Sequence, residues 1–415
     1  MRKTLPLVAS GLIAALALAG CTSPDTSNSD GVVELTMWTG FTGGDRGSYE
    51  ALIEEFNATH DDIQVTMEVQ PWDTISQKLP AAWATGQGPD IATPNFDPNI
   101  LGKYLETNSL LALDSVGDGE TQINADKLFP AAIEAFTADD TLYAVPANVA
   151  TLQLYYNKDL FAAAGIDAPP ATVDEFRDYA QQLTGDGVYG LSVADHETIQ
   201  MWPILQWLDG GDIVDSDGCS VLDSAANIES LTTWANLLQD GVMPLGLTGA
   251  ESDALFSAGQ AAMQLNGPWA AAGYTDAGIN LGVASVPTGV DGDVTLGSTV
   301  PLAIAASTKH PAEAQEFLAW WTGAEAQTQF ALSSGFPPVR TDLGDNAELA
   351  ANEIVAAFAS ALPSARLYLV GVPGAPEVDA EAYVPLIGEI SRGTDVATAA
   401  AAASEKINSI TGCKG

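Results

Sequence analysis

Basic side chains are scarce in this sequence. Its 415 residues include 14 Lys and Arg against 54 Asp and Glu, which gives a formal net charge of −40. Phosphate backbones are bound by clustered Lys and Arg, so this balance argues against a DNA- or RNA-binding surface. It also argues against a polybasic patch for anionic lipids. The acidity is typical of a protein that stays soluble in an extracellular or salty medium.

Metal-binding and catalytic signatures are also missing. The three histidines, His60, His196 and His310, are dispersed along the chain, so no His-built metal site is expected. The segment 215–218 lacks the downstream Glu of a calcium loop and predicts a polar turn. The chain contains no G-x-S-x-G, H-E-x-x-H or P-loop motif, so we expect neither an enzyme nor a cofactor.

Only the N-terminus carries a long apolar run. Arg2 and Lys3 precede about fifteen apolar residues, a length typical of a signal peptide and too short for a comfortable membrane span. The run ends in Leu-Ala-Gly-Cys, which resembles a bacterial lipobox. We therefore expect a lipoprotein signal peptide at 1–20, lipidation of Cys21 and a flexible polar tether at 21–31. An ordinary secretory signal is the alternative.

Two cysteines remain, Cys219 and Cys413. Outside the cytoplasm a pair of thiols tends to be oxidised. A bridge between these two would close a loop of roughly two hundred residues, which the chain-entropy model values at more than about 4 kcal/mol. We expect this disulfide, with two separate thiols as the alternative.

Hydrophobic periodicity predicts an α/β fold. Residues 32–37, 63–69 and 90–92 have the pattern of strands, and helices are predicted between them. The same order returns after residue 143 and ends in an alanine-rich helix at 396–410. Such alternation is typical of a sheet with helices on its faces. The core stripe of the first helix consists of Tyr49, Leu52, Ile53 and Phe56.

Several short motifs follow one another in a characteristic order. Together, over roughly residues 32–340, they resemble the family-1 bacterial extracellular solute-binding proteins of ABC importers, the family that includes maltose-binding protein. The motifs are LTMW at 35–38, GPDI at 88–91, VP at 145–146, YYNKD at 155–159, WP at 202–203, DGG at 209–211, FSAGQAAM at 256–263, NGPW at 266–269, GS at 297–298 and the helix at 311–322.

The resemblance implies a periplasmic-binding-protein-like (type II) fold, in which two α/β lobes are joined by a hinge that the chain crosses more than once. Lobe one would hold 32–147 and 300–340, and lobe two 148–299 and 341–415. The implied function is capture of a carbohydrate, such as an oligosaccharide, between the lobes and its delivery to a membrane permease. The protein would be an extracytoplasmic monomer, held to the membrane by its lipid anchor alone.

Aromatic candidates for the site follow from the chemistry of sugars, which present hydroxyl edges and apolar C–H faces. Trp269 matches the family's GPW position, where the ring stacks on sugar, and Trp202 matches a Trp-Pro that lines the cleft wall. Trp38 ends the first strand beside a Gly-rich turn. Core packing is the alternative for all three. The other tryptophans, Trp72 among them, are predicted to be packing or surface residues.

Polar candidates complete the predicted site. Alignment on GPDI places the family's ligand-gripping Asp at Asp97, and Asn148 lies at the presumed lobe crossing. The chain departs from maltose-binding protein at Pro94, which replaces an aromatic, and at Ala150, which replaces a carboxylate. A maltodextrin ligand is therefore not implied. The other candidates are Asp45, Asn95, His196, Glu197, Asn266, Gly267 and Ser298.

Other cargoes stay open at this stage. A glycerophosphodiester would need Arg or a free helix N-terminus for its phosphate, and Arg46 is the obvious candidate. A ferric ion would need paired tyrosines. Tyr155 and Tyr156 are adjacent on a predicted strand and point to opposite faces, so they cannot grip one ion together.

Overall fold

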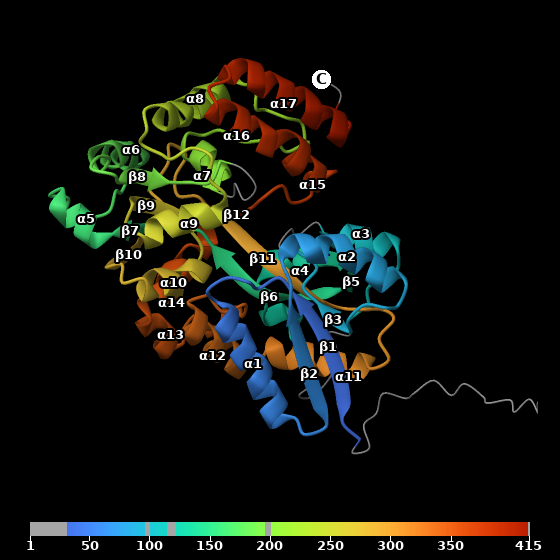
Figure 1. Ribbon diagram of the computed structural model, residues 1–415. Coiled ribbons are helices and arrows are strands. Elements are labelled where there is room, and N and C mark those ends of the chain that lie inside the picture. Colours follow the sequence, from blue (N-terminus) through green and yellow to red (C-terminus); the bar gives the residue numbers. More distant parts are fainter. Residues whose placement is uncertain (1–30, 96–99, 114–121, 196–200, 414–415) are drawn as a thin grey trace, which may run out of the picture.

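The computed structural model describes residues 31–95, 100–113, 122–195 and 201–413. Helices and strands alternate along the chain, as the hydrophobic pattern predicts, and the strands form two main sheets (Figure 1). Within these residues no helix combines the length and the apolar character that a membrane span requires.

The first sheet has six strands in the order β12-β11-β3-β1-β2, with β6 paired to β11 as well. β1 runs parallel to β2 and β3, whereas β11 runs antiparallel to β3 and β6. Leu35 and Met37 of β1 are buried and Glu34 and Thr36 are exposed, which confirms the alternation in the sequence. The strands are β1 (Val33–Thr39), β2 (Ile63–Val69), β3 (Ile91–Ala92), β6 (Ala144–Thr151), β11 (Thr295–Ile304) and β12 (Ala365–Leu367).

Helices pack around this sheet. The first of them buries the predicted stripe of Tyr49, Leu52, Ile53 and Phe56. The second begins at Trp72, because Pro71 and an acidic first turn favour a helix start there. The elements are α1 (Arg46–Thr59), α2 (Trp72–Ala84), α3 (Leu101–Glu106), α4 (Pro130–Ala135), the hairpin β4 (Thr137–Ala138) and β5 (Thr141–Leu142), α11 (Pro311–Trp321) and α12 (Ala324–Ser334).

The second sheet has the order β10-β7-β9-β8. Its strands are β7 (Gln153–Asn157), β8 (Tyr189–Ser192), β9 (Ala261–Asn266) and β10 (Leu281–Ala284). The helices that accompany it or follow it are α5 (Lys158–Ala163), α6 (Val173–Gln182), α7 (Met201–Leu208), α8 (Ala225–Gln239), α9 (Gly249–Ser257), α10 (Ala271–Asp276), α13 (Ala347–Ala351), α14 (Glu353–Ser360), α15 (Ala375–Val378), α16 (Val384–Ser391) and α17 (Val396–Thr411).

Each sheet has its own apolar core, and β6 and β11 pass from one core to the other (Figure 1). On β6, Ala150 belongs to the first core, whereas Leu152 just beyond the strand belongs to the second. On β11, Val300 belongs to the first core and Leu296 to the second. We call the two bodies lobe one and lobe two. The predicted boundaries at 147 and 299 fall within these two strands.

The segment 347–360 contacts both lobes, whereas the sequence places all of 341–415 in lobe two. Val355 of α14 packs with Ala331 of α12 in lobe one. Phe358, at the other end of the same helix, packs with Tyr155 of β7 in lobe two. Its carbonyl accepts a 2.9 Å hydrogen bond from the Thr151 hydroxyl at the crossing. The lobe assignment along the chain stays a prediction.

The predicted disulfide joins Cys219 and Cys413, whose Cα atoms are 5.4 Å apart. Cys219 lies in a polar turn, as predicted, because the Asp215 carboxylate accepts 2.9 Å bonds from the backbone N–H groups of residues 217 and 219. The next residue, Ser220, donates its backbone N–H to Asn408 of α17 at 2.8 Å. The C-terminal helix is thus tied to lobe two by a covalent bond and a hydrogen bond.

Candidate ligand-binding site

In lobe one the parallel strands β1, β2 and β3 end at the same edge of the sheet. Thr39 lies opposite Val69, and Trp38 lies opposite Ala92. The Thr93 hydroxyl donates a 3.0 Å hydrogen bond to Thr39 just beyond the strands. In open α/β sheets, ligands bind outside the carboxyl ends of the strands. The loops that leave this edge, at 40–45, 70–72 and 93–95, are therefore the candidate ligand wall of lobe one.

In lobe two the carboxyl end of β9 lies next to the lobe crossing. Asn266 at the end of β9 pairs with Gln153, the first residue of β7 after the chain leaves β6. The short 3-10 helix Pro268–Ala270 follows and carries Trp269. Trp269 is partly exposed and packs against the cores of both lobes. It is therefore well placed to form the opposite wall.

The two walls meet where the glycine-rich loop of lobe one reaches Trp269. A Cβ built on Gly44 would lie 3.2 Å from the Trp269 carbonyl oxygen, and one built on Gly43 would lie 4.0 Å from the Trp269 Cβ. The Gly44 distance is tighter than an ordinary contact, whereas the Gly43 distance is a normal van der Waals contact. The Gly-rich turn that the sequence analysis singled out is thus an interlobe contact.

Asp45 ends this loop at the start of α1. Its side chain is only 7% exposed, and burial raises its pKa to about 6. The carboxylate lies beneath Gly43, where a built Cβ would be 2.7 Å from Oδ1. Neighbouring Tyr49 is fully buried, and burial together with the Asp45 charge raises its pKa. A desolvated carboxylate beside the interlobe contact is a strong hydrogen-bond acceptor for a ligand hydroxyl.

Asp45→Asn should stabilise the unliganded protein above about pH 6 and have little effect near pH 4. The folded-state pKa of Asp45 lies above its unfolded value, so ionised Asp45 costs stability, and this cost grows as pH rises from about 4 to about 6. Melting temperatures of both proteins across that range measure the effect. The exposed Asp61→Asn, in the turn between α1 and β2, is the matched control and should not change them. A variant that melts lower than wild type at pH 8 would contradict this prediction.

Two predicted polar residues make only structural hydrogen bonds in this conformation. Asn148 is buried and donates to the Tyr49 hydroxyl at 2.6 Å. Asn266 is buried in a network, where its amide donates to Asp253 at 2.7 Å and to the Tyr274 hydroxyl at 2.8 Å. Its amide oxygen accepts from the backbone N–H of Gly267 at 2.8 Å. Asn266 therefore supports the turn that carries Trp269.

Trp202 is a core residue. It is fully buried in the second core, and its indole N–H donates to the Ala194 carbonyl at 2.8 Å. Every residue of α7 is buried, so no side of this helix faces solvent. The expectation that Trp202 lines the cleft wall is not met, because the helix lies inside lobe two.

The remaining predicted site residues fall into two groups, those at the edge of the first sheet and those outside the described residues. Trp38 is partly exposed at the end of β1, and Ser298 is partly exposed on β11 opposite Ala150. Asn95 follows β3 and donates to the Ser76 hydroxyl at 2.9 Å. These three lie at or beyond the carboxyl edge of the first sheet. Cys21, Asp97, His196 and Glu197 lie outside the described residues.

Trp72, predicted to be a packing or surface residue, also lies at this edge of the sheet. Its partly exposed ring lies over Gly40 and meets Phe41 edge-on, with ring centroids 5.7 Å apart. It follows the parallel strand β2, and ligand-binding loops start at the carboxyl ends of such strands. The tyrosine prediction is confirmed: Tyr155 packs in a small cluster with Phe256, whereas Tyr156 packs on the other side against the lobe-two core.

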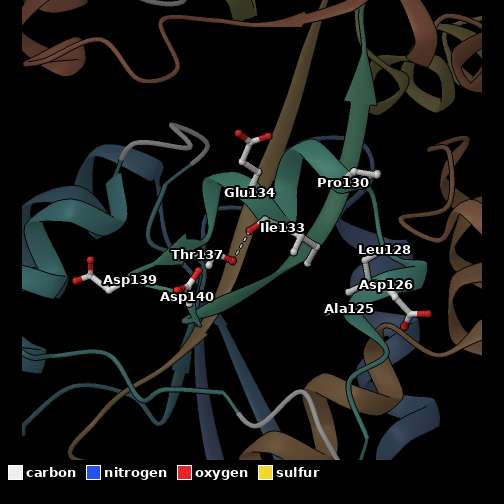
Figure 2. A pocket seen from close by; sticks show the side chains of 9 residues that line it. All are labelled: Ala125, Asp126, Leu128, Pro130, Ile133, Glu134, Thr137, Asp139 and Asp140. Atoms are coloured by element: carbon white, nitrogen blue, oxygen red, sulfur yellow. Dashed lines mark hydrogen bonds between the residues drawn. The ribbon is translucent and has the colours of Figure 1, made fainter.

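Two pockets have linings that include neither Trp269 nor the loop at 40–45. One, of about 420 Å³, is lined by Leu105 and Phe136 of the lobe-one core and by Leu367 of β12 and Val370 just beyond it. Another, of about 660 Å³, belongs to lobe one alone and is acidic (Figure 2). Figure 2 shows the carboxylates of the acidic pocket spread along its walls rather than converging. Across the described parts of the chain, no three His, Cys, Asp or Glu side chains form a candidate metal site.

Comparison with known proteins bears on this geometry. The sequence model of the bacterial extracellular solute-binding protein family matches residues 42–328. A maltotriose-binding protein of Pyrococcus abyssi is 26% identical over 364 residues, which cover 84% of this chain and 74% of that protein.

Two solved structures share the fold. The GacH receptor of Streptomyces glaucescens, solved unliganded and with acarbose, has a TM-score of 0.81 at 24% identity, covering 92% of this chain and 100% of that one. UgpB of Mycobacterium tuberculosis with glycerophosphocholine has a TM-score of 0.81 at 23% identity, covering 92% of this chain and 98% of that one. The two-lobed, type II periplasmic-binding-protein-like fold is thereby confirmed. Because the family match spans well over half of its length, this chain belongs to the bacterial extracellular solute-binding proteins of ABC transporters.

Proposed function

We propose that this protein captures a carbohydrate, above all an oligosaccharide, between its two lobes and delivers it to a membrane permease. The sequence relationship to a maltotriose-binding protein supports a sugar cargo. Trp269 carries the proposal. It offers a partly exposed indole to an apolar sugar face at the point where the lobes meet. Asp45 on the facing loop supplies an acceptor for a hydroxyl edge.

Binding acts through the hinge formed by β6 and β11. Rotation about these strands would open or close the gap between the Trp269 turn and the loop at 40–45. A ligand that contacts both walls favours the closed state, and it shifts the equilibrium only by its difference in affinity for the two states. Binding with a micromolar dissociation constant supplies about −8 kcal/mol in total. The closed form would then be the one that docks on the permease.

The N-terminal sequence supports a lipid anchor at Cys21. An acylated cysteine followed by the polar tether at 21–31 would hold the binding lobes close to the permease outside the cytoplasm. Two acyl chains anchor a protein stably, whereas one alone is marginal. Fractionation of cells tests this part of the proposal, since the anchored protein sediments with membranes.

A glycerophosphodiester is the second candidate, because UgpB, which shares the fold, is seen with glycerophosphocholine. Arg46 follows the interlobe loop and is the natural phosphate partner there. Its guanidinium Nε, however, donates to Glu50 at 2.7 Å on the exposed face of α1. This pairing makes a phosphate ligand less suited to the loop than a neutral sugar.

A thermal-shift panel tests the proposed function. The panel holds glucose, maltotriose, galacto- and arabino-oligosaccharides and glycerophosphocholine. We expect at least one sugar to raise the melting temperature by several degrees, since a ligand at a hundred times its dissociation constant stabilises by about 2.7 kcal/mol. A shift with glycerophosphocholine alone would favour the second candidate. Hydrolysis of a sugar at catalytic protein concentration would contradict a purely binding role.

A further inference from the structure

The turn that carries Trp269 is held through the backbone of Gly267. The N–H of Gly267 donates to the Asn266 amide oxygen at 2.8 Å, and its carbonyl accepts from the Tyr155 hydroxyl at 2.9 Å. The indole of Trp269 lies against the same glycine, where a built Cβ would come within 2.2 to 2.5 Å of three ring atoms. Because the 3-10 helix Pro268–Ala270 starts directly after Gly267, these two hydrogen bonds determine where the indole lies.

One carboxylate oxygen lies behind this turn, Oδ1 of Asp253 on α9. It accepts hydrogen bonds from the Asn266 amide at 2.7 Å and from the Gln264 amide at 2.8 Å. The Tyr274 hydroxyl lies 3.1 Å from the same oxygen. Gln264 and Asn266 belong to β9 and Tyr274 belongs to α10, so a single atom joins three elements around the turn. We call these four residues the turn network.

The charge of Asp253 decides how the Asn266 amide is oriented. An ionised carboxylate only accepts hydrogen bonds, so the NH₂ group of Asn266 must point toward Asp253. The amide oxygen of Asn266 then points toward the N–H of Gly267, as the bond between them requires. Burial raises the pKa of Asp253, and hydrogen bonds from its three partners oppose this shift. The turn network therefore stabilises the ionised carboxylate.

We propose that Asp253 is a positioning residue of the binding site, which fixes the Asn266 amide and through it the turn of Trp269, without contacting the ligand. This inference rests on the proposed function and adds to it a residue that lies outside both ligand walls. Binding groups are held in place when side chains behind them are locked by hydrogen bonds. Gln264, Asn266 and Tyr274 are all buried, so each would be left without an acceptor if the carboxylate were removed.

Lobe two contains a matched control for Asp253 in a second, mostly buried carboxylate, Asp209. It accepts hydrogen bonds from the Ser230 hydroxyl at 2.8 Å and from the Trp234 indole at 2.9 Å, and it forms an ion pair with Arg177. These partners lie on α6 and α8, in the core of lobe two. Alanine at either aspartate removes an acceptor that three side chains share, so both variants should melt at a lower temperature than wild type.

The test measures two properties of Asp253→Ala and Asp209→Ala, the affinity for the best-bound sugar of the panel and the hydrogen exchange of the Gly267 amide without ligand. Asp253→Ala should bind the sugar about tenfold more weakly, because the indole must then be ordered on binding. Its Gly267 amide should exchange at least tenfold faster than in wild type. Asp209→Ala should match wild type in both properties. Asp253→Asn keeps an acceptor oxygen and should recover most of the affinity.

Three results would overturn the positioning role and leave the proposed function standing. Asp253→Ala could bind like wild type, it could bind weakly while the Gly267 amide exchanges normally, which would mean direct contact with the ligand, or Asp209→Ala could weaken binding equally. If Asp253→Ala does not fold, Tyr155→Phe replaces it, since this variant removes only the hydroxyl that bonds the Gly267 carbonyl and should also weaken binding. If wild type binds no sugar, the proposed function fails, and the exchange of the Gly267 amide alone decides whether Asp253 fixes the turn.

Discussion

Trp269→Ala should abolish the thermal shift produced by the best sugar in the panel and weaken its binding about thirtyfold or more. The indole lies at the meeting point of the lobes and packs against both cores, so a ligand stacked on it is largely removed from water. Central aromatic residues of this kind cost about 2 kcal/mol or more when truncated. Calorimetric titration measures the loss.

Trp269→Phe is the matched variant for this prediction. It keeps a flat ring over Gly267 and should retain most of the affinity. Both variants should unfold cooperatively without ligand, since the buried network of Asn266, Asp253 and Tyr274 that holds the turn is unchanged. An undiminished thermal shift in Trp269→Ala would remove Trp269 from the site.

Removing the disulfide should lower the melting temperature by on the order of 10 °C. The bridge between Cys219 and Cys413 spans 194 residues. In the chain-entropy model, closing so long a loop raises the free energy of the unfolded state by about 5 kcal/mol. Each kcal/mol of lost stability lowers the melting temperature by roughly 2–4 °C in a domain of about 150–250 residues. The double variant Cys219→Ser/Cys413→Ser, compared with wild type by calorimetry, measures the effect.

Reduction of wild type provides the control for the disulfide. Wild-type protein in a strong reductant should melt close to the double variant, because both lack the same covalent link. The bridge clamps α17, whose apolar face packs through Ala400, Ala403 and Ile407 into the lobe-two core. The loss of stability should therefore appear first as faster hydrogen exchange of the backbone amides of α17 and α8. Equal melting temperatures for oxidised wild type and the double variant would show that the disulfide does not stabilise the protein and would contradict this prediction.

Local pattern was enough to predict much of the fold. The alternation around Leu35 and Met37 predicted a strand because successive strand residues face opposite sides. The stripe from Tyr49 to Phe56 predicted a helix because residues three and four apart share a face. The polar turn at Asp215 was also predicted from the local sequence, and the structure confirms it. The disulfide was predicted from the expected compartment and from the two remaining cysteines, and it is present as well.

The tryptophans show where local pattern fails. Trp202 was judged by its motif, and its interpretation as a residue of the cleft wall was wrong. Trp72 was predicted to be a packing or surface residue, and the sequence did not indicate which edge of the sheet it would occupy. Trp202 bonds the Ala194 carbonyl inside lobe two, on a helix that is buried all round. Trp72 lies on Gly40 at the sheet edge, because β1 and β2 run parallel and end together.

From its residues alone, this chain specifies an acidic α/β protein, and it orders its helices and strands through periodicities that span a few residues. Which indoles reach the space between the lobes depends on contacts between segments far apart in the chain. Gly44 meets Trp269 because the two lobes pack together, and Trp72 meets Gly40 because β1 and β2 end at the same edge of one sheet. Exposure is a property of that packing, so spacing along the chain cannot predict it.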